Sequence, residues 1–154
     1  IPLTTHINLK NIHRNLNKIK LKKNLNIMMN LLNSKKYKLN FSIFKFLCYN
    51  PHCSENGTIG KEDKLINQLI SKYFKNILGP YPADSAFTNF KKNTLFISTY
   101  HDQALIPYKI INKKGFNFTL GLNYRRLSPA HGTAKDIKFK NKSDNTSYLA
   151  CMLS

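Results

Sequence analysis

Three histidines stand apart from the lysine-rich remainder of the chain. His6 follows two threonines, His52 follows an Asn-Pro pair, and His101 precedes an Asp-Gln pair. Three imidazoles that meet in space can bind a divalent ion and leave coordination positions open for a substrate. No two of them have the i, i+4 spacing that aligns ligands on one helix face, so the fold would have to bring them together. From the spacing alone, three separate surface or capping histidines are the simpler interpretation.

The elements that would position these residues alternate between strand and helix. Strands are predicted where apolar, β-branched and aromatic residues run together, and helices where apolar residues recur every three or four positions. The predicted strands are Phe41–Cys48, Thr94–Thr99 and Phe116–Leu122, and the predicted helices are Lys61–Ile77, Ala104–Ile111, Asn145–Ser154 and one or two within Lys10–Lys38. Ile1–Leu9 is expected to be a strand end or loop, and Asn50–Gly57 and Arg125–Gly132 to be loops. The alternation predicts α/β layers, and open α/β folds place their sites in loops that follow strands.

Two of the helical patterns predict which residues are buried. The apolar positions with near-helical spacing are Ile12, Leu16, Ile19, Leu25, Met28, Met29 and Leu32 in the first, and Leu65, Leu69, Ile70, Phe74 and Ile77 in the second. Gly79-Pro80 is expected to break the second helix. For the first pattern, ordinary packing is favoured over a basic helix on a membrane surface.

The formal net charge of +18 over 154 residues is typical of proteins that bind nucleic acid. Here, however, the basic residues are spread along the chain, and only Arg14, Arg125 and Arg126 are arginines, the residue type that reads bases bidentately. Heavy use of Lys, Asn and Ile together indicates a coding bias toward A·T-rich codons, which raises the charge without a polyanionic partner. We therefore expect no nucleic-acid and no membrane partner, while a small anionic substrate fits the charge.

The cysteines Cys48, Cys53 and Cys151 are odd in number and form no Cys-x-x-Cys pair. We therefore expect no disulfide framework and a reducing compartment, with Cys48 buried as a small apolar residue. No apolar run approaches the roughly 20 residues that span a bilayer, and no signal-peptide pattern is present. A soluble cytoplasmic protein is the expectation.

Five short motifs occur in one order along the chain. They are Asn50-Pro51-His52, Gly79-Pro80-Tyr81-Pro82-Ala83-Asp84, Tyr100-His101-Asp102-Gln103, Asn117-Phe118-Thr119-Leu120-Gly121-Leu122 and His131-Gly132-Thr133-Ala134. Five motifs in order with sensible spacings make coincidence improbable. The series resembles the 4-hydroxythreonine-4-phosphate dehydrogenase family from about Thr4 to the C-terminus, and only sparsely within Lys10–Phe46.

The resemblance implies a three-layer α/β fold like that of isocitrate and isopropylmalate dehydrogenases, incomplete at the N-terminus. Residues 1–154 would be the C-terminal portion of the enzyme, a single domain plus part of a second. The N-terminal half, with a His-Thr pair that contacts substrate, would be missing, and the start at Ile1 fits a fragment. The resemblance also implies a homodimer with a shared metal site, in which His6 and His52 of one subunit bind the metal together with His101 of the other.

The substrate and cofactor residues are likewise implied by the resemblance. The positions Lys109, Asn117 and Arg126 would hold the phosphorylated amino acid 4-phosphohydroxy-L-threonine, with Arg125 as an alternative to Arg126. The loop residues His131, Gly132, Thr133 and Ala134, together with Asp136, would contact NAD. This loop is not a GxGxxG fingerprint, so no Rossmann fold is predicted.

The implied reaction explains these residue types. A divalent metal on the substrate hydroxyl would favour its deprotonation and hydride loss, and would then stabilise the enolate as carbon dioxide leaves, giving 3-amino-2-oxopropyl phosphate in vitamin B6 biosynthesis. Imidazoles suit zinc, and open positions for oxygen ligands would admit magnesium or cobalt. Asp84 and Asp102 are candidates for proton transfer or for orienting a histidine, and Lys109 is a further catalytic candidate. Each also has a structural interpretation, since Asp84 would cap a helix and Lys109 would be a solvated charge.

Two loops depart from the family pattern. After His52 the chain reads Cys53-Ser54-Glu55-Asn56-Gly57, where the family favours Ala-Gly-Glu-Gly-Gly, and the loss of glycines limits backbone freedom. Ala130 stands where the family often has an acid, and Lys138–Asn141 replaces a glycine-containing turn, which weakens the expected cofactor contacts. An inactive remnant of the enzyme is therefore one alternative, and a basic nucleic-acid-binding protein is a more distant one.

Overall fold

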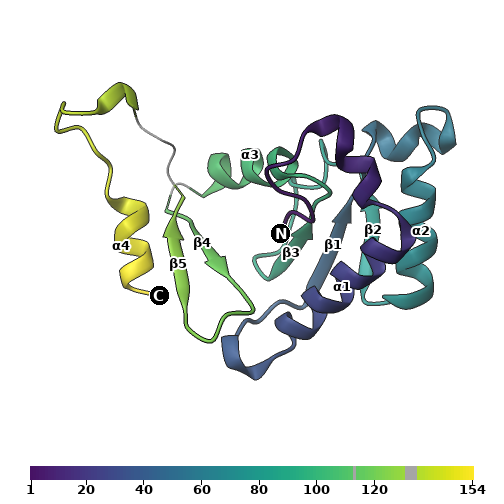
Figure 1. Ribbon diagram of the computed structural model, residues 1–154, viewed down its shortest axis with the longest axis horizontal. Helices are drawn as coiled ribbons and strands as arrows, with labels where there is room; N and C mark the ends of the chain where they lie inside the picture. The colour runs from purple at the N-terminus through teal and green to yellow at the C-terminus, as the bar shows by residue number, and fades with distance from the viewer. Residues whose placement is uncertain (113, 131–134) are drawn as a thin grey trace. The chain divides into compact units, whose positions relative to one another are not determined.

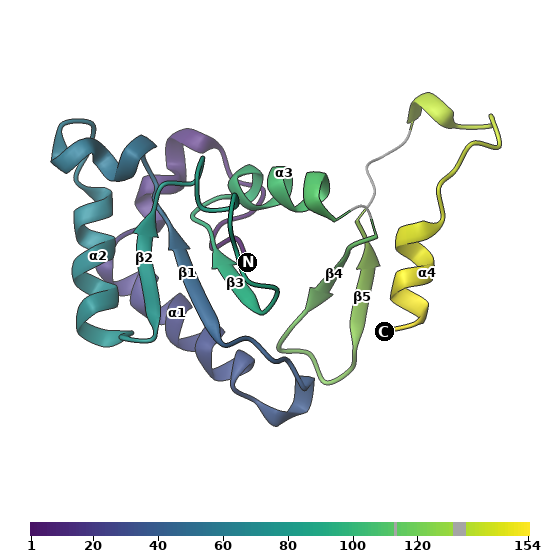
Figure 2. The ribbon, with the colours of Figure 1, turned by 180° about the vertical axis from the view of Figure 1, so that it is seen from behind.

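A parallel sheet with the strand order β2-β1-β3 holds the first part of the chain together (Figures 1 and 2). In this computed structural model β1 is Ile43–Leu47, β2 is Ile77–Tyr81 and β3 is Thr94–Ile97. The structure describes residues 1–112, 114–130 and 135–154, which form two units, Ile1–Leu105 and Ile106–Ser154. Pro2 forms a parallel bridge with Ser98. The N-terminal segment therefore runs beside the carboxyl end of β3 and in the same direction.

Alternation along the strands gives the sheet a packed face. Phe44 lies in register with Ile77 and Leu95, and Phe46 with Ile97, and all five side chains are buried. Residues in register point to the same side of a sheet, so these side chains form one apolar layer. Helix α1 (Lys18–Leu32) crosses the sheet on one side, in front of it in Figure 1 and behind it in Figure 2. Its Leu32 lines a cavity together with Phe44, which identifies the covered face.

The predicted helical region Lys10–Lys38 contains one α-helix, α1, between two 3-10 turns, η1 (Leu9–Asn15) and η2 (Lys35–Tyr37). Asn17 caps α1, because its side chain accepts a hydrogen bond of 3.0 Å from the Lys20 N–H. The predicted burial of Ile19 is wrong, since this residue is 82% exposed and Leu21 is buried instead. The two residues are 200° apart around a helix of 3.6 residues per turn, and Leu21 is the one aligned with Leu25.

Helix α2 (Glu62–Tyr73) is shorter than the predicted Lys61–Ile77. Phe74 and Ile77 are buried as expected, but Ile77 begins strand β2, which the sequence pattern did not predict. Gly79-Pro80 lies inside this strand rather than breaking a helix. Proline is tolerated there because β2 is at the sheet edge and needs no donor on its outer side. A Cβ at Gly79 would lie 2.6 Å from the Phe46 carbonyl oxygen, so the close pairing with β1 requires glycine.

The second unit contains an antiparallel pair, β4 (Phe116–Thr119) and β5 (Arg126–Pro129), and helix α4 (Thr146–Met152). Helix α3 (His101–Ile111) begins three residues earlier than predicted and continues into this unit, and η4 spans Lys135–Ile137. The prediction of a loop over Arg125–Gly132 is wrong for the β5 residues. Arg126 and Pro129 are atypical of strands, so the sequence pattern did not indicate this short alternating strand. Ser147 joins α4 to both strands, since it donates to the Gly115 carbonyl and accepts from the Ala130 N–H at 2.8 Å.

The expectation of no disulfide framework does not hold for one pair of cysteines. The structure pairs Cys48 with Cys53, whose Cα atoms are 5.0 Å apart, and leaves Cys151 free. The physical reason is the chain reversal after β1, which returns Cys53 to the strand end without a Cys-x-x-Cys spacing. Cys48 is buried as expected, with 1% of its surface exposed. Among the helices of the described ranges, none has the length and apolarity to cross a bilayer.

Candidate functional site

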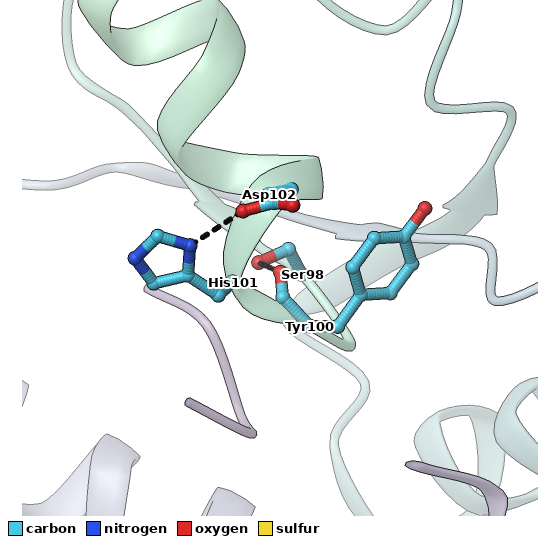
Figure 3. A network of polar contacts seen from close by, with 4 residues as sticks. All are labelled: Ser98, Tyr100, His101 and Asp102. Carbon is cyan, nitrogen blue, oxygen red and sulfur yellow. Dashed lines mark hydrogen bonds and ion pairs between the residues drawn. The ribbon is translucent and has the colours of Figure 1, made fainter. Parts of the chain in front are cut away.

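His101 and Asp102 form a pair in the first turn of α3, directly after β3 (Figure 3). The His101 Nδ1 and Asp102 Oδ1 atoms are 2.7 Å apart, and the side chains are 45% and 65% exposed. A neutral imidazole that donates its Nδ1 proton to this carboxylate leaves Nε2 as the acceptor nitrogen. That arrangement orients metal-bound histidines in many proteins.

His6 lies beside this pair. The centroids of the His6 and His101 rings are 5.7 Å apart, with the ring planes at 80°. Their proximity comes from backbone pairing: the Leu3 N–H donates to the Ser98 carbonyl at 2.8 Å, and the Thr4 hydroxyl donates to the Thr99 carbonyl at 2.7 Å. The segments after Thr4 and after Thr99 therefore leave the sheet together at the carboxyl end of β3, where His6 and His101 meet.

Gln103 fixes the start of α3 against two strand ends. Its Oε1 accepts from the Thr99 N–H at 2.9 Å and from the Thr99 hydroxyl at 3.1 Å. Its Nε2 donates to the Cys48 carbonyl at 2.5 Å. Because Thr99 and Cys48 are buried, this one amide satisfies backbone groups that water cannot reach. Gln103 thereby connects the start of α3, where His101 lies, to the end of β1.

His52 lies in the loop after β1, within the run of 3-10-type turns η3 (Pro51–Gly57). Five consecutive non-glycine residues here have positive φ angles, between 42° and 68° in His52–Asn56. The left-handed region costs an L-residue about 1–2 kcal/mol, so surrounding contacts must stabilise this conformation. The Asp63 carboxylate supplies such contacts, since it accepts hydrogen bonds from two backbone N–H groups and one hydroxyl of residues 49–54.

Two neighbours of this loop have shifted pKa values. Burial acts to raise the pKa of the Glu62 carboxyl, but hydrogen bonds from its own backbone N–H and from the Asn50 amide outweigh it, so the pKa lies below its usual range. Burial, followed by the nearby Glu62 charge, raises the pKa of the Tyr49 hydroxyl. Tyr49 therefore remains a neutral phenol at neutral pH.

The histidine pair has a spacing that suits a metal ion. A Zn²⁺ ion lies about 2.0–2.1 Å from an imidazole nitrogen, which places the centroids of two tetrahedral ligands about 5 Å apart. The distance of 5.7 Å between His6 and His101 is close to that value. His52 does not complete the set within one chain, because the described residues contain no group of three His, Cys, Asp or Glu side chains able to hold a metal. The pair thus fits two ligands of such a site.

Two of the expected substrate residues share one face of the β4-β5 pair. Asn117 is in register with Ser128, and Thr119 with Arg126, so all four side chains point to the same side. Arg126 Nη1 donates to the Thr119 hydroxyl at 3.0 Å, and Arg126 and Asn117 are exposed. The opposite face carries the apolar residues Phe116, Phe118, Leu127 and Pro129. The polar face therefore offers hydrogen-bond donors to an anionic ligand.

The remaining candidates are more dispersed. Lys109 is exposed in the last turn of α3, and Asp84 is exposed in the turn after β2. Asp136 is exposed in η4. The expected cofactor residues His131, Gly132, Thr133 and Ala134 lie outside the described residues.

Two residues that organise the site were missed from the sequence, Asp63 and Gln103. Asp63 had a detectable signal: it lies three and seven positions before Ile66 and Ile70, on the buried face of α2. An acid on an apolar face has to find donors inside the protein. Gln103 lies in the same motif as His101, and nothing in the local pattern indicates that its amide binds two strand ends.

Polar residues follow the parallel strands of this α/β fold, and the Asp–His pair lies where open α/β folds place their ligand sites. Comparison with known proteins identifies the group. The sequence model of the family described as pyridoxal phosphate biosynthetic protein PdxA matches residues 1–153, and the chain belongs to this family.

Relatives and solved structures agree with this assignment. The 4-hydroxythreonine-4-phosphate dehydrogenase of Hydrogenobaculum sp. (strain Y04AAS1) is 40% identical over 139 residues, covering 89% of this chain and 44% of the relative. That of Aquifex aeolicus (strain VF5) is 38% identical over 154 residues, covering 96% and 47%. The crystal structure of the Klebsiella pneumoniae enzyme matches with a TM-score of 0.75 at 27% identity, over 99% of this chain and 48% of that one. The predicted α/β dehydrogenase fold is confirmed, and the chain spans about half the length of these relatives.

Proposed function

We propose that this chain supplies the C-terminal half of a 4-hydroxythreonine-4-phosphate dehydrogenase. The complete site would oxidise 4-phosphohydroxy-L-threonine with NAD, and loss of carbon dioxide would give 3-amino-2-oxopropyl phosphate for vitamin B6 biosynthesis in the cytoplasm. The observation that carries the proposal is the His6–His101–Asp102 arrangement, in a chain whose relatives bear that enzyme name.

The histidines would hold a divalent metal ion. Zinc, magnesium or cobalt at this position would supply Lewis-acid stabilisation of negative charge on the substrate oxygen. Asp102 keeps the His101 ring oriented, with Nε2 left as the ligand atom. His52 would add a third ligand. The resemblance implies that His6 and His52 of one subunit bind the metal with His101 of the other, and we propose a homodimer that shares the site, while within this chain it is His6 and His101 that lie together.

The phosphorylated end of the substrate would lie against the polar face of β4-β5. Arg126 is suited to bind phosphate bidentately, and Asn117 offers an amide on the same face. Lys109 would add a positive charge. Asp84 or Asp102 would accept the proton released from the substrate hydroxyl, and Asp136, with the His131–Ala134 loop, would contact NAD.

The test is NADH formation from 4-phosphohydroxy-L-threonine by the complete natural gene product in the presence of divalent metal. We expect turnover, and a loss of at least a hundredfold in His52→Ala and in His101→Ala. His13→Ala is the matched control, because His13 lies in η1 and belongs to none of the proposed ligand sets. No turnover by the natural product with any of the three metals would refute the proposal and favour an inactive remnant.

A further inference from the structure

We propose that Asp63 is the positioning residue that holds His52 in its ligand conformation. The proposal rests on the function proposed above, in which His52 binds the metal. Asp63 lies in the first turn of α2, eleven residues after His52, and none of the five motifs includes it. Its role follows from where its two carboxylate oxygens are engaged.

The Asp63 carboxylate spans both ends of the segment that carries His52. Oδ1 accepts from the Tyr49 N–H at 2.6 Å, and Oδ2 accepts from the Asn50 N–H at 3.0 Å. Oδ2 also accepts from the Ser54 hydroxyl at 2.6 Å. His52 is the middle residue between Asn50 and Ser54, so one oxygen atom anchors the chain two residues before it and two residues after it.

We call the three hydrogen bonds from residues 49–54 to Asp63 the clamp. It lies in a buried environment, so water does not compete for these bonds. Asp63 and Ser54 each expose 2% of their surface, so neither can exchange its partner for water. A buried carboxylate is tolerated where several donors satisfy it, and here all three donors come from the loop. The Asn50 amide adds a second connection, since it donates to the Ser54 oxygen at 3.0 Å and to Glu62 at 3.0 Å.

The backbone of the loop needs such a clamp. His52 has a φ of 47°, and the next four residues are also in the left-handed region. The left-handed region is unfavourable for L-residues, so a free loop would leave this arrangement. The hydrogen bonds of Asp63 go to the Tyr49 and Asn50 N–H groups and to the Ser54 hydroxyl, so it acts by fixing the backbone from which the ring projects.

The experiment uses the complete gene product with Co²⁺ as a spectroscopic probe. Asp63→Asn keeps the size of the side chain but directs an amide donor at groups that themselves donate. We expect its Co²⁺ dissociation constant to rise at least tenfold, and the Tyr49 and Asn50 amides of the metal-free protein to exchange faster, while the Ile97 amide in β3 keeps its protection. In the assay, excess metal should restore kcat, and KM for the phosphorylated substrate should stay within twofold.

Two further variants keep the outcome decisive. Ser54→Ala removes one donor and leaves the charge, so it should weaken Co²⁺ binding severalfold even if Asp63→Asn unfolds. Asp144→Asn is the matched control, because Asp144 is an exposed aspartate of the second unit, and it should bind Co²⁺ as the wild type does.

The inference is overturned if Asp63→Asn and Ser54→Ala both bind Co²⁺ within twofold of wild type, or if Asp63→Asn unfolds while Ser54→Ala binds normally. It is also overturned if the wild type binds no Co²⁺ or if His52→Ala binds as tightly as wild type. Absence of turnover alone would refute the proposed function and not this inference, because metal affinity and amide exchange are measured without substrate.

Discussion

Replacing Gln103 with alanine should destabilise the first unit more than any exposed substitution of the same type. Gln103→Ala removes the partner of the Thr99 N–H and of the Cys48 carbonyl. Thr99 is fully buried and Cys48 is 1% exposed, so water cannot replace the amide without opening the strand ends. A buried polar group left without a partner costs about 1–3 kcal/mol, which predicts a loss of about 2–6 kcal/mol for the two groups.

The assay is amide exchange of the first unit, with the free energy of unfolding taken from the slowest amides of β1 and β3. Gln68→Ala is the control, because Gln68 is an exposed glutamine on α2, and its change should stay within about 0.5 kcal/mol. Gln103→Glu is a second variant. It keeps an oxygen for Thr99 but turns an acceptor toward the buried Cys48 carbonyl, so it should destabilise the unit at least as much as Gln103→Ala.

The reasoning would be refuted by a Gln103→Ala protein whose unfolding free energy lies within about 0.5 kcal/mol of wild type and whose Thr99 amide exchanges no faster. That result would mean that the strand ends hold together without the amide. A destabilised protein with an unchanged Thr99 amide would refute the assigned hydrogen bond and not the importance of the residue.

Two other predictions concern the second unit and the cysteines. Burial, followed by the charge of Cys151, raises the pKa of the Tyr108 hydroxyl above its usual value of 10.0, and this hydroxyl donates to the Phe116 carbonyl at 3.0 Å. The neutral phenol is therefore favoured in the folded state, so its stabilisation is complete below pH 10 and is lost as the pH rises through the raised pKa. Tyr108→Phe should lower the unfolding free energy by about 0.5–1.5 kcal/mol at neutral pH and flatten this alkaline dependence in urea titrations; an unchanged alkaline slope would contradict it. Under mild oxidation, alkylation and peptide mass mapping should find Cys48 linked to Cys53 and only Cys151 modified, whereas a Cys151 cross-link would contradict the pairing.

Much of the fold was predictable where one physical signal dominated. The runs around Phe46 and Ile97 are apolar, β-branched and aromatic, and β1 and β3 formed where these runs predicted strands. Strand β2 was missed since Gly79-Pro80 normally ends an element. Only the strand order, which a local pattern does not encode, shows that this segment is an edge strand next to Phe46.

The candidate site was predictable in its residue types and not in its assembly. His6 was selected because it follows two threonines and His101 because it lies in a motif, but their spacing of 95 residues gives no reason for contact. The contact depends on the pairing of residues 1–3 with Ser98, which is a property of the whole sheet. His52 shows the converse, since its position depends on a carboxylate that belongs to another element and to no motif.

Ser54 shows how the chain tolerates the loss of glycine after His52. The family favours glycine at this position, and here serine has a φ of 68°, which costs about 1–2 kcal/mol. The serine hydroxyl offsets that cost, because it donates to the buried Asp63, and a glycine has no such donor. Ser54→Gly would relieve the backbone and lose the hydrogen bond, so its stability should lie near that of wild type. Ser54→Ala would lose the same bond and keep the strain. Alanine should therefore be less stable than glycine at this position, the reverse of their usual order in regular structure. The opposite order in urea unfolding would show that residue 54 is not held in the left-handed conformation.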